Sequence, residues 1–213
     1  MIGTAAEVLL EKIKSEESLE RADLRDLGLN HATLENAKLG RSDLEGVNFE
    51  AANLRQADLS CANLSEAYMA GVDLEGGNLQ KANLEGANLE AANLQFADVR
   101  HANLRGATLE RANLKVARLS YAQIDFANLA RALLTEAQLD NASMCQAYLG
   151  GADFTKADMQ QIRMAETNLQ DANLTSANLT EATLTHALSE GVDFSNACLR
   201  GRCLTIPLWQ IAF

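Results

Sequence analysis

The sequence is poor in the residues that most folds use for turns and for large cores. It has 1 Pro and 13 Gly in 213 residues, which argues against a fold with many tight hairpins. Aromatic residues make up only 5% of the chain, and Ala and Leu supply most of the apolar side chains. The core must therefore consist of small and medium side chains. No apolar run approaches the length of a membrane span.

Basic residues and reactive motifs are also scarce. The sequence has 18 Lys and Arg against 29 Asp and Glu, a net charge of -11, which disfavours nonspecific nucleic-acid binding because phosphate contacts need a basic surface. The 4 cysteines form no C-x-x-C pair and the start lacks a signal-peptide pattern, so we expect free thiols in a cytoplasmic protein. No nucleophile elbow, phosphate-binding loop or metal-ligand spacing is present. We expect no catalytic, cofactor or metal site, and thus no enzyme.

A five-residue repeat dominates what is present. An apolar residue recurs at every fifth position from Leu24 to Leu204, and only Ser189 breaks the rule. Ala stands two positions before the centre in 28 of 37 units, and Asn or Asp stands one position before it in 21. An α-helix does not fit this period, because successive centres would rotate by about 140° around its axis and share no face. A flat strand does not fit either, because its inward positions must be two residues apart. The chain should therefore bend once per unit and wind around its own core as a β-solenoid.

The consensus A-(N/D)-L-x-x resembles the pentapeptide-repeat family. Residues 82–84, 87–89 and 92–94 match that family's motif without departure, and the resemblance covers about residues 22 to 204. It implies an all-β fold, a right-handed quadrilateral β-helix with about four pentapeptides per coil, in which residue n lies against residue n + 20. The 37 units would make about nine coils and a rod about 45 Å long.

A solenoid exposes unpaired backbone at both ends, so we expect both ends to be covered. Residues 1–20 should form an N-terminal capping helix and lead-in, because Thr4 and Glu7 make a capping box before an amphipathic pattern. Residues 21–204 should form the pentapeptide-repeat β-helix. Residues 205–213 are apolar, and two interpretations stay open: a C-terminal cap, or a homodimer contact made by Leu208, Trp209, Ile211 and Phe213.

Sorting the outward positions by coil brings two groups of side chains together. The face centred on Leu39 and Leu59 gathers a basic and aromatic group that suits an acidic partner surface or a phosphate group: Lys81, Arg100, His101, Arg118 and Tyr121. An apolar column of Phe96, Val116 and Leu133 is a candidate partner contact. A solvated face is the ordinary alternative for each group. The face centred on Leu24 and Leu44 is the acidic side.

Together these features predict a non-enzymatic rigid scaffold that mediates protein–protein interaction and regulates a partner protein. We expect it neither to bind nucleic acid directly nor to associate with a membrane. The resemblance implies an alternative, because some members mimic DNA and bind a type II topoisomerase such as gyrase, which they protect or inhibit, usually as end-to-end dimers. The net charge and the apolar C-terminus fit that alternative. The Leu-centred consensus looks more like the cyanobacterial-type members than the Phe-rich topoisomerase binders.

Overall fold

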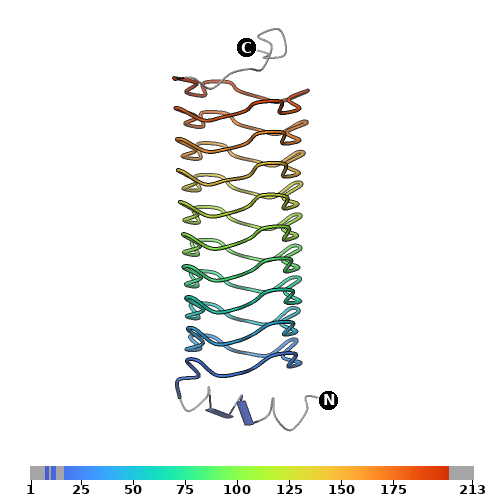
Figure 1. The fold of residues 1–213 in the computed structure, drawn as a ribbon, viewed down its shortest axis with the longest axis vertical. Coiled ribbons are helices and arrows are strands. Elements are labelled where there is room, and N and C mark those ends of the chain that lie inside the picture. The colour runs from blue at the N-terminus through green and yellow to red at the C-terminus, as the bar shows by residue number, and fades with distance from the viewer. Residues whose placement is uncertain (1–7, 10, 13–16, 202–213) are drawn as a thin grey trace.

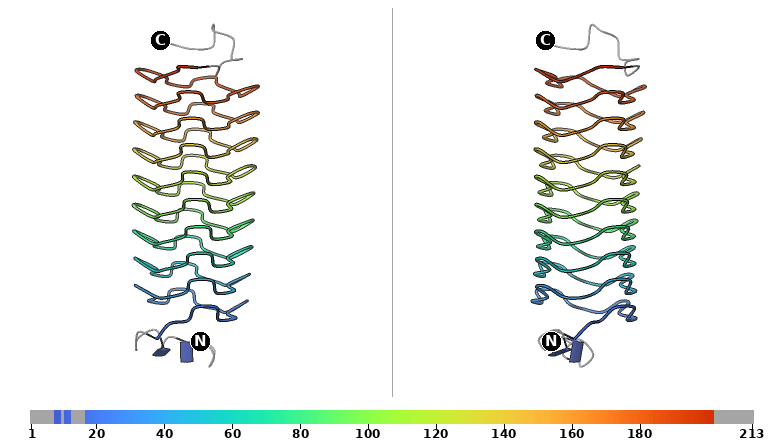
Figure 2. Two further views of the ribbon diagram at one scale, coloured as in Figure 1. Left: turned by 60° about the vertical axis from the view of Figure 1, so that its left-hand side comes forward. Right: turned by 90° about the vertical axis from the view of Figure 1, so that its left-hand side faces the viewer.

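The protein is a straight rod of stacked coils in a computed structural model that describes residues 8, 9, 11, 12 and 17–201 (Figures 1 and 2). Neighbouring coils are joined by parallel β-bridges between residues n and n + 20, from Asp23 with Asp43 to Asn178 with Cys198. These are isolated bridges, and residues 17–201 contain no longer strand. The register confirms the β-helical repeat solenoid that the sequence predicts.

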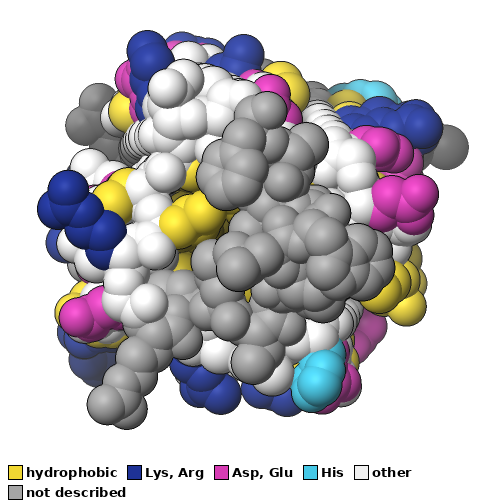
Figure 3. Space-filling view, turned by 90° about the horizontal axis from the view of Figure 1, so that it is seen from above, with side chains coloured by type: hydrophobic (Ala, Val, Ile, Leu, Met, Phe, Trp, Pro, Cys, Tyr) yellow, Lys and Arg dark blue, Asp and Glu magenta, His cyan; other side chains and the backbone are white. Residues whose placement is uncertain are grey.

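Each coil makes four bridges to the next coil, one per pentapeptide, and so has four faces. The bridge series that begin at Asp23, Gly28, Thr33 and Lys38 define faces I, II, III and IV in that order around the coil. Face II therefore lies opposite face IV. Seen end on, charged side chains project around the outline of the rod (Figure 3).

The two ends of the chain are described only in part. Val8, Leu9, Glu11 and Lys12 have helical backbone, and Leu9 belongs to the same buried cluster as the first coils. The rest of the predicted capping segment before residue 17 lies outside the described residues. So do residues 205–213, with Leu208, Trp209, Ile211 and Phe213. The capping helix, the number of coils, the domain limits and the C-terminal contact stay predictions.

The chain bends at every corner through a residue with left-handed backbone. Every fifth residue from Arg21 to Gly201 has a φ between 52° and 103°. Across a typical corner the Ala32 N–H donates to the Leu29 carbonyl at 3.1 Å. This hydrogen bond and the positive φ at the third position are those of a type II turn. One bend per pentapeptide lets two side chains of each unit point into the core.

The central apolar residue and the Ala two positions before it form that core. From Leu24 to Phe194 the centres are buried, and Phe49 and Phe154 are the largest side chains that are fully enclosed. The Ala side chains are buried beside them. Their small size lets this part of each face approach the axis.

Three hydroxyls replace apolar groups in the core, and two of them have partners. The Ser42 and Thr167 hydroxyls donate to the carbonyls of the preceding turn, Leu39 at 2.5 Å and Met164 at 2.8 Å. Ser189 is buried at a centre, and its Oγ has no hydrogen-bond partner within the described part of the chain. A buried hydroxyl without a partner is unfavourable, so the core around Ser189 is less stable than the core around an apolar centre.

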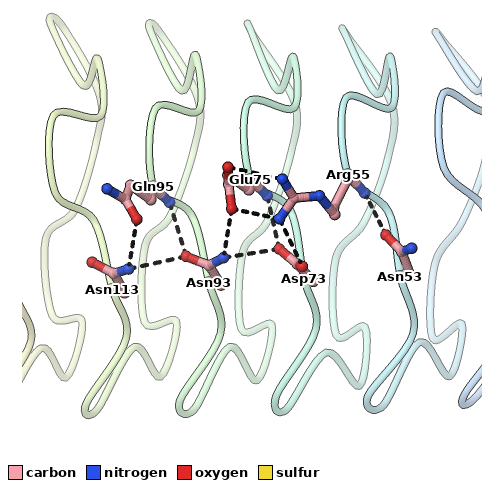
Figure 4. Close-up of polar contacts among 7 residues, drawn as sticks. All are labelled: Asn53, Arg55, Asp73, Glu75, Asn93, Gln95 and Asn113. Carbon is pink, nitrogen blue, oxygen red and sulfur yellow. Dashed lines mark hydrogen bonds and ion pairs between the residues drawn. The ribbon is translucent and has the colours of Figure 1, made fainter.

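Where Asn or Asp precedes the centre, its side chain completes the hydrogen bonding of the corner. In residues 52–56 the N–H groups of four residues donate to carbonyls, and only that of Arg55 does not. The Arg55 N–H instead donates to Asn53 Oδ1 at 3.0 Å. Asn93 also extends a ladder along face III, since its Nδ2 donates to Asp73 Oδ1 at 2.9 Å and its Oδ1 accepts from Asn113 at 3.0 Å (Figure 4). The consensus amide thus serves both its own turn and the next coil.

Two glycines with open surroundings test the need for left-handed corners. No atom lies within 4 Å of a Cβ placed on Gly106 or Gly28, but Gly106 has a φ of +65° and Gly28 lies outside the left-handed region. We expect Gly106→Ala to lower the free energy of unfolding by about 1 kcal/mol, because the added Cβ is strained there. Gly28→Ala should raise it by about 0.5 kcal/mol, because the unfolded chain loses freedom. Denaturant unfolding of dilute protein measures both; equal effects would contradict the turn assignment.

Candidate interaction surface

The basic and aromatic side chains predicted from the sequence lie along one corner of the rod and the adjoining face. Lys81, His101 and Tyr121 are the left-handed residues of the corner between faces IV and I in successive coils. The rings of His101 and Tyr121 are stacked, with centroids 5.0 Å apart and planes 10° from parallel. Stacking across the coils holds two exposed rings in fixed positions.

Asp98 holds the two arginines of this group in place. Arg100 Nε and Nη2 donate to the two carboxylate oxygens at 2.8 and 2.7 Å, and Arg118 Nη1 donates from the next coil at 3.1 Å. Burial would raise the pKa of Asp98, but the hydrogen bonds from Arg100 and the charge of Arg118 outweigh it and lower the pKa below its ordinary value. One carboxylate thus offsets part of the charge of two guanidinium groups.

The apolar candidates flank the same face from its other corner. Phe96 and Val116 are corner residues between faces III and IV in adjacent coils, and 53% and 39% of their surfaces are exposed. Leu133 is a bridge residue of face III in the following coil and is 36% exposed. The eight candidate contacts therefore gather around face IV within a few coils. Their role as contacts stays a prediction.

Face II carries a surface that the sequence analysis did not single out. Two adjoining hollows of about 450 and 400 Å³ lie on it, and both are lined by Phe126, Tyr148 and Asn168. The guanidinium carbon of Arg105 lies 5.3 Å from the centre of the Phe126 ring. A signal was available in the sequence, because Tyr68 and Tyr148 are separated by a multiple of twenty residues and thus share one face.

The described residues offer little material for reaction chemistry. Among residues 8, 9, 11, 12 and 17–201, no group of His, Cys, Asp and Glu side chains could hold a metal ion. Cys61, Cys145 and Cys198 are free thiols. In the same part of the chain no helix has the length and apolar character needed to cross a lipid bilayer.

A four-sided solenoid built from five-residue units, with its side chains filling the axis, defines a class of repeat proteins. The chain belongs to the pentapeptide-repeat family. The family model described as "Pentapeptide repeats" matches it in 8 copies, over residues 32–69, 67–106, 100–135, 132–171 and 172–205. No curated protein matches this chain.

The solved structures to which this chain is similar include the following three. HetL, involved in heterocyst differentiation regulation in the cyanobacterium Nostoc sp. strain PCC 7120, is 30% identical over 90% of this chain and 91% of that chain, with a TM-score of 0.48. Rfr23 from the cyanobacterium Cyanothece 51142 is 29% identical over 55% of this chain and 95% of that chain, with a TM-score of 0.53. QnrB1, a plasmid-mediated fluoroquinolone resistance protein, is 14% identical over 89% and 87%, with a TM-score of 0.56. The likeness to QnrB1 concerns the fold alone.

The ion pairs of Asp98 predict a stability difference that depends on pH. Because its pKa is lowered in the folded protein, the carboxylate stabilises the fold above its ordinary pKa of 3.8, and this is lost as the pH falls through the lowered value. Asp98→Asn should lower the free energy of unfolding by about 1 kcal/mol at neutral pH, and the difference from wild type should shrink below pH 3.8.

Asp158 provides a matched control on the same face. Its carboxylate accepts hydrogen bonds from the neutral side chains of Gln160 and Asn178. Asp158→Asn should therefore change the stability by less than about 0.5 kcal/mol. Denaturant unfolding across the pH range measures both variants, and equal losses at neutral pH would contradict a special role for Asp98.

Proposed function

We propose that the protein is a non-enzymatic rigid scaffold that binds a protein partner around face IV and regulates it by contact. In this proposal the scaffold is the whole rod of about nine coils that the sequence predicts. The N-terminal helix covers its first coil, and the protein acts in the cytoplasm. The partner surface is acidic where it meets Lys81 and Arg118, and apolar where it meets Phe96 and Val116. HetL, the similar cyanobacterial protein, is involved in the regulation of differentiation, which agrees with a regulatory role.

The arrangement of side chains around face IV carries this proposal. The His101 and Tyr121 rings are stacked, and Arg100 and Arg118 are fixed by Asp98, so the surface is ordered before a partner arrives. An ordered surface loses little conformational entropy on binding. Exposed aromatic and Arg side chains together with an apolar patch are the composition that protein interfaces favour.

The alternative, a DNA mimic that binds gyrase, is favoured by the net charge of -11. The acidic face is partly neutralised, however. Arg25 pairs with both Asp23 and Asp43, and Arg105 pairs with Asp125. A mimic of the phosphate backbone needs a continuous row of unpaired negative charges, so we place this function second.

Affinity capture from the native host with paired variants tests the proposal. We expect the wild type to retain a protein that Lys81→Glu/Arg118→Glu loses by at least about tenfold, because the charge of the contact is reversed. The matched control is Arg163→Glu, which changes an exposed bridge residue of face I. This variant should still retain the captured protein. Retention by all three proteins, or capture by none, would contradict a face IV contact. Altered supercoiling by purified gyrase at about 1 µM protein would favour the mimic instead.

A further inference from the structure

Face II differs from the other three faces because none of its bridge residues carries a charge. Each other face has at least three charged bridge residues. Along face II the bridge residues are Gly28, Asn48, Tyr68, Asn88, Thr108, Asn128, Tyr148, Asn168 and Leu188. Tyr68, Tyr148 and Leu188 are exposed to 60%, 61% and 59% of their surfaces. A neutral face with three large exposed apolar groups is therefore built into an acidic rod.

The order of these residues is the same in both directions from Thr108. Each direction reads Asn, Tyr, Asn, and the ends are Gly28 on one side and Leu188 on the other. In an isologous pair, residue i of one subunit meets residue j of the other and j meets i. A two-fold axis at Thr108 with the rods antiparallel therefore places Tyr68 opposite Tyr148 of the second copy, and Asn88 opposite Asn128.

We propose that face II is the interface of an antiparallel, side-by-side homodimer centred on Thr108. The net charge of -11 favours this face over the others, because two copies repel each other and only face II brings no charged bridge residues together. The eight candidate contacts gather around face IV, on the opposite side, and stay exposed. The dimer therefore does not rest on the proposed partner binding.

The shape of face II suits this pairing. Tyr148 borders both hollows. The small residues Gly106, Ala130 and Gly150 line the hollow of about 400 Å³, and Gln146, Glu166 and Leu188 line the other. Tyr68 of the second copy arrives at the level of Tyr148 and fills the hollow beside it. At the ends of the interface the Leu188 side chain meets Gly28, where nothing lies within 4 Å of the Cβ position. Large side chains thus meet gaps at both places.

The polar groups of face II are also available for a second copy. On face I, Asn83 and Asn103 use their Nδ2 groups to donate to the preceding coil at 3.0 and 2.9 Å. The Nδ2 groups of Asn88 and Asn128 have no acceptor among the described residues, because the residues one coil away on face II are not Asn or Asp. In the antiparallel pair these two amides lie opposite each other and can exchange hydrogen bonds.

One edge of the interface, where faces II and III meet, adds an ion pair between the two copies. Arg131 is a corner residue between faces II and III and lies three positions after Asn128. Glu90 lies two positions after Asn88, directly before the corner residue Ala91. The axis at Thr108 brings Glu90 of one copy beside Arg131 of the other, twice per dimer. A face about 45 Å long and about 10 Å wide buries about 900 Å² over the two copies, which is the size of a weak, transient contact, so we expect association no tighter than micromolar.

Analytical ultracentrifugation of the full chain from about 1 to about 200 µM tests the dimer. The wild type should sediment as a monomer–dimer equilibrium. Tyr148→Glu should weaken it at least about tenfold, because it places charge opposite the second copy. The matched control is Gln123→Glu, which adds the same charge at an exposed neutral bridge residue of face I and should leave the equilibrium unchanged. A wild type that stays monomeric throughout, or equal effects of the two variants, would overturn the proposal.

A cross-linking experiment tests the antiparallel register. In the variant Gly28→Cys/Leu188→Cys the two new thiols of one chain are eight coils apart, about 38 Å, too far for an internal disulfide. We expect oxidation to link Cys at position 28 of one chain to Cys at position 188 of another, identified by mass spectrometry. A link between two copies of position 188 would mean parallel rods and overturn the register. Links only through residues 202–213 or other native thiols would place the interface elsewhere.

Discussion

The left-handed residue at every corner is the constraint on which the rest of the structure depends. A chain that turns at each fifth residue cannot form longer strands, so its backbone groups pair with the coils on either side through single bridges. The residue at the turn needs a φ near +60°, although 29 of these 37 corners do not have Gly. Such residues are strained on their own. The strain is offset because the corner N–H groups from Arg21 to Glu181 donate to carbonyls of the next coil, as that of Phe96 does to Lys115 at 3.1 Å.

The consensus follows from this geometry. The turn leaves one N–H of each unit without a carbonyl, and the side chain of Asn or Asp two positions earlier accepts it, as Asn53 does for Arg55. The two inward positions differ in the room they have, which places Ala at one and Leu at the other. Where a hydroxyl enters the core it must find a carbonyl, as Thr167 does with Met164. Each consensus residue therefore serves the corner, the ladder or the core.

The sequence was sufficient to predict the solenoid, because an uninterrupted five-residue period fits no other regular structure. The stacking of residue n on n + 20 was predicted from the family resemblance, and it placed His101 beside Tyr121 correctly. Propensity could not predict left-handed backbone at Val116 or Phe96, because β-branched and aromatic residues avoid it and only the coil imposes it. The binding of two arginines to Asp98 depends on side-chain conformation, which the positions of the charges in the sequence do not determine.

The register of twenty residues per coil also decides which surfaces exist, since both the face IV group and the neutral face II are columns of residues far apart in the sequence. Distances between nitroxide labels on face IV, measured by pulsed electron resonance with the other cysteines replaced, test that register most directly. Labels at positions 38 and 138 should lie about 24 Å apart, and labels at 38 and 198 about 38 Å apart, in proportion to the number of coils. Distances that do not grow with the number of coils would contradict the account.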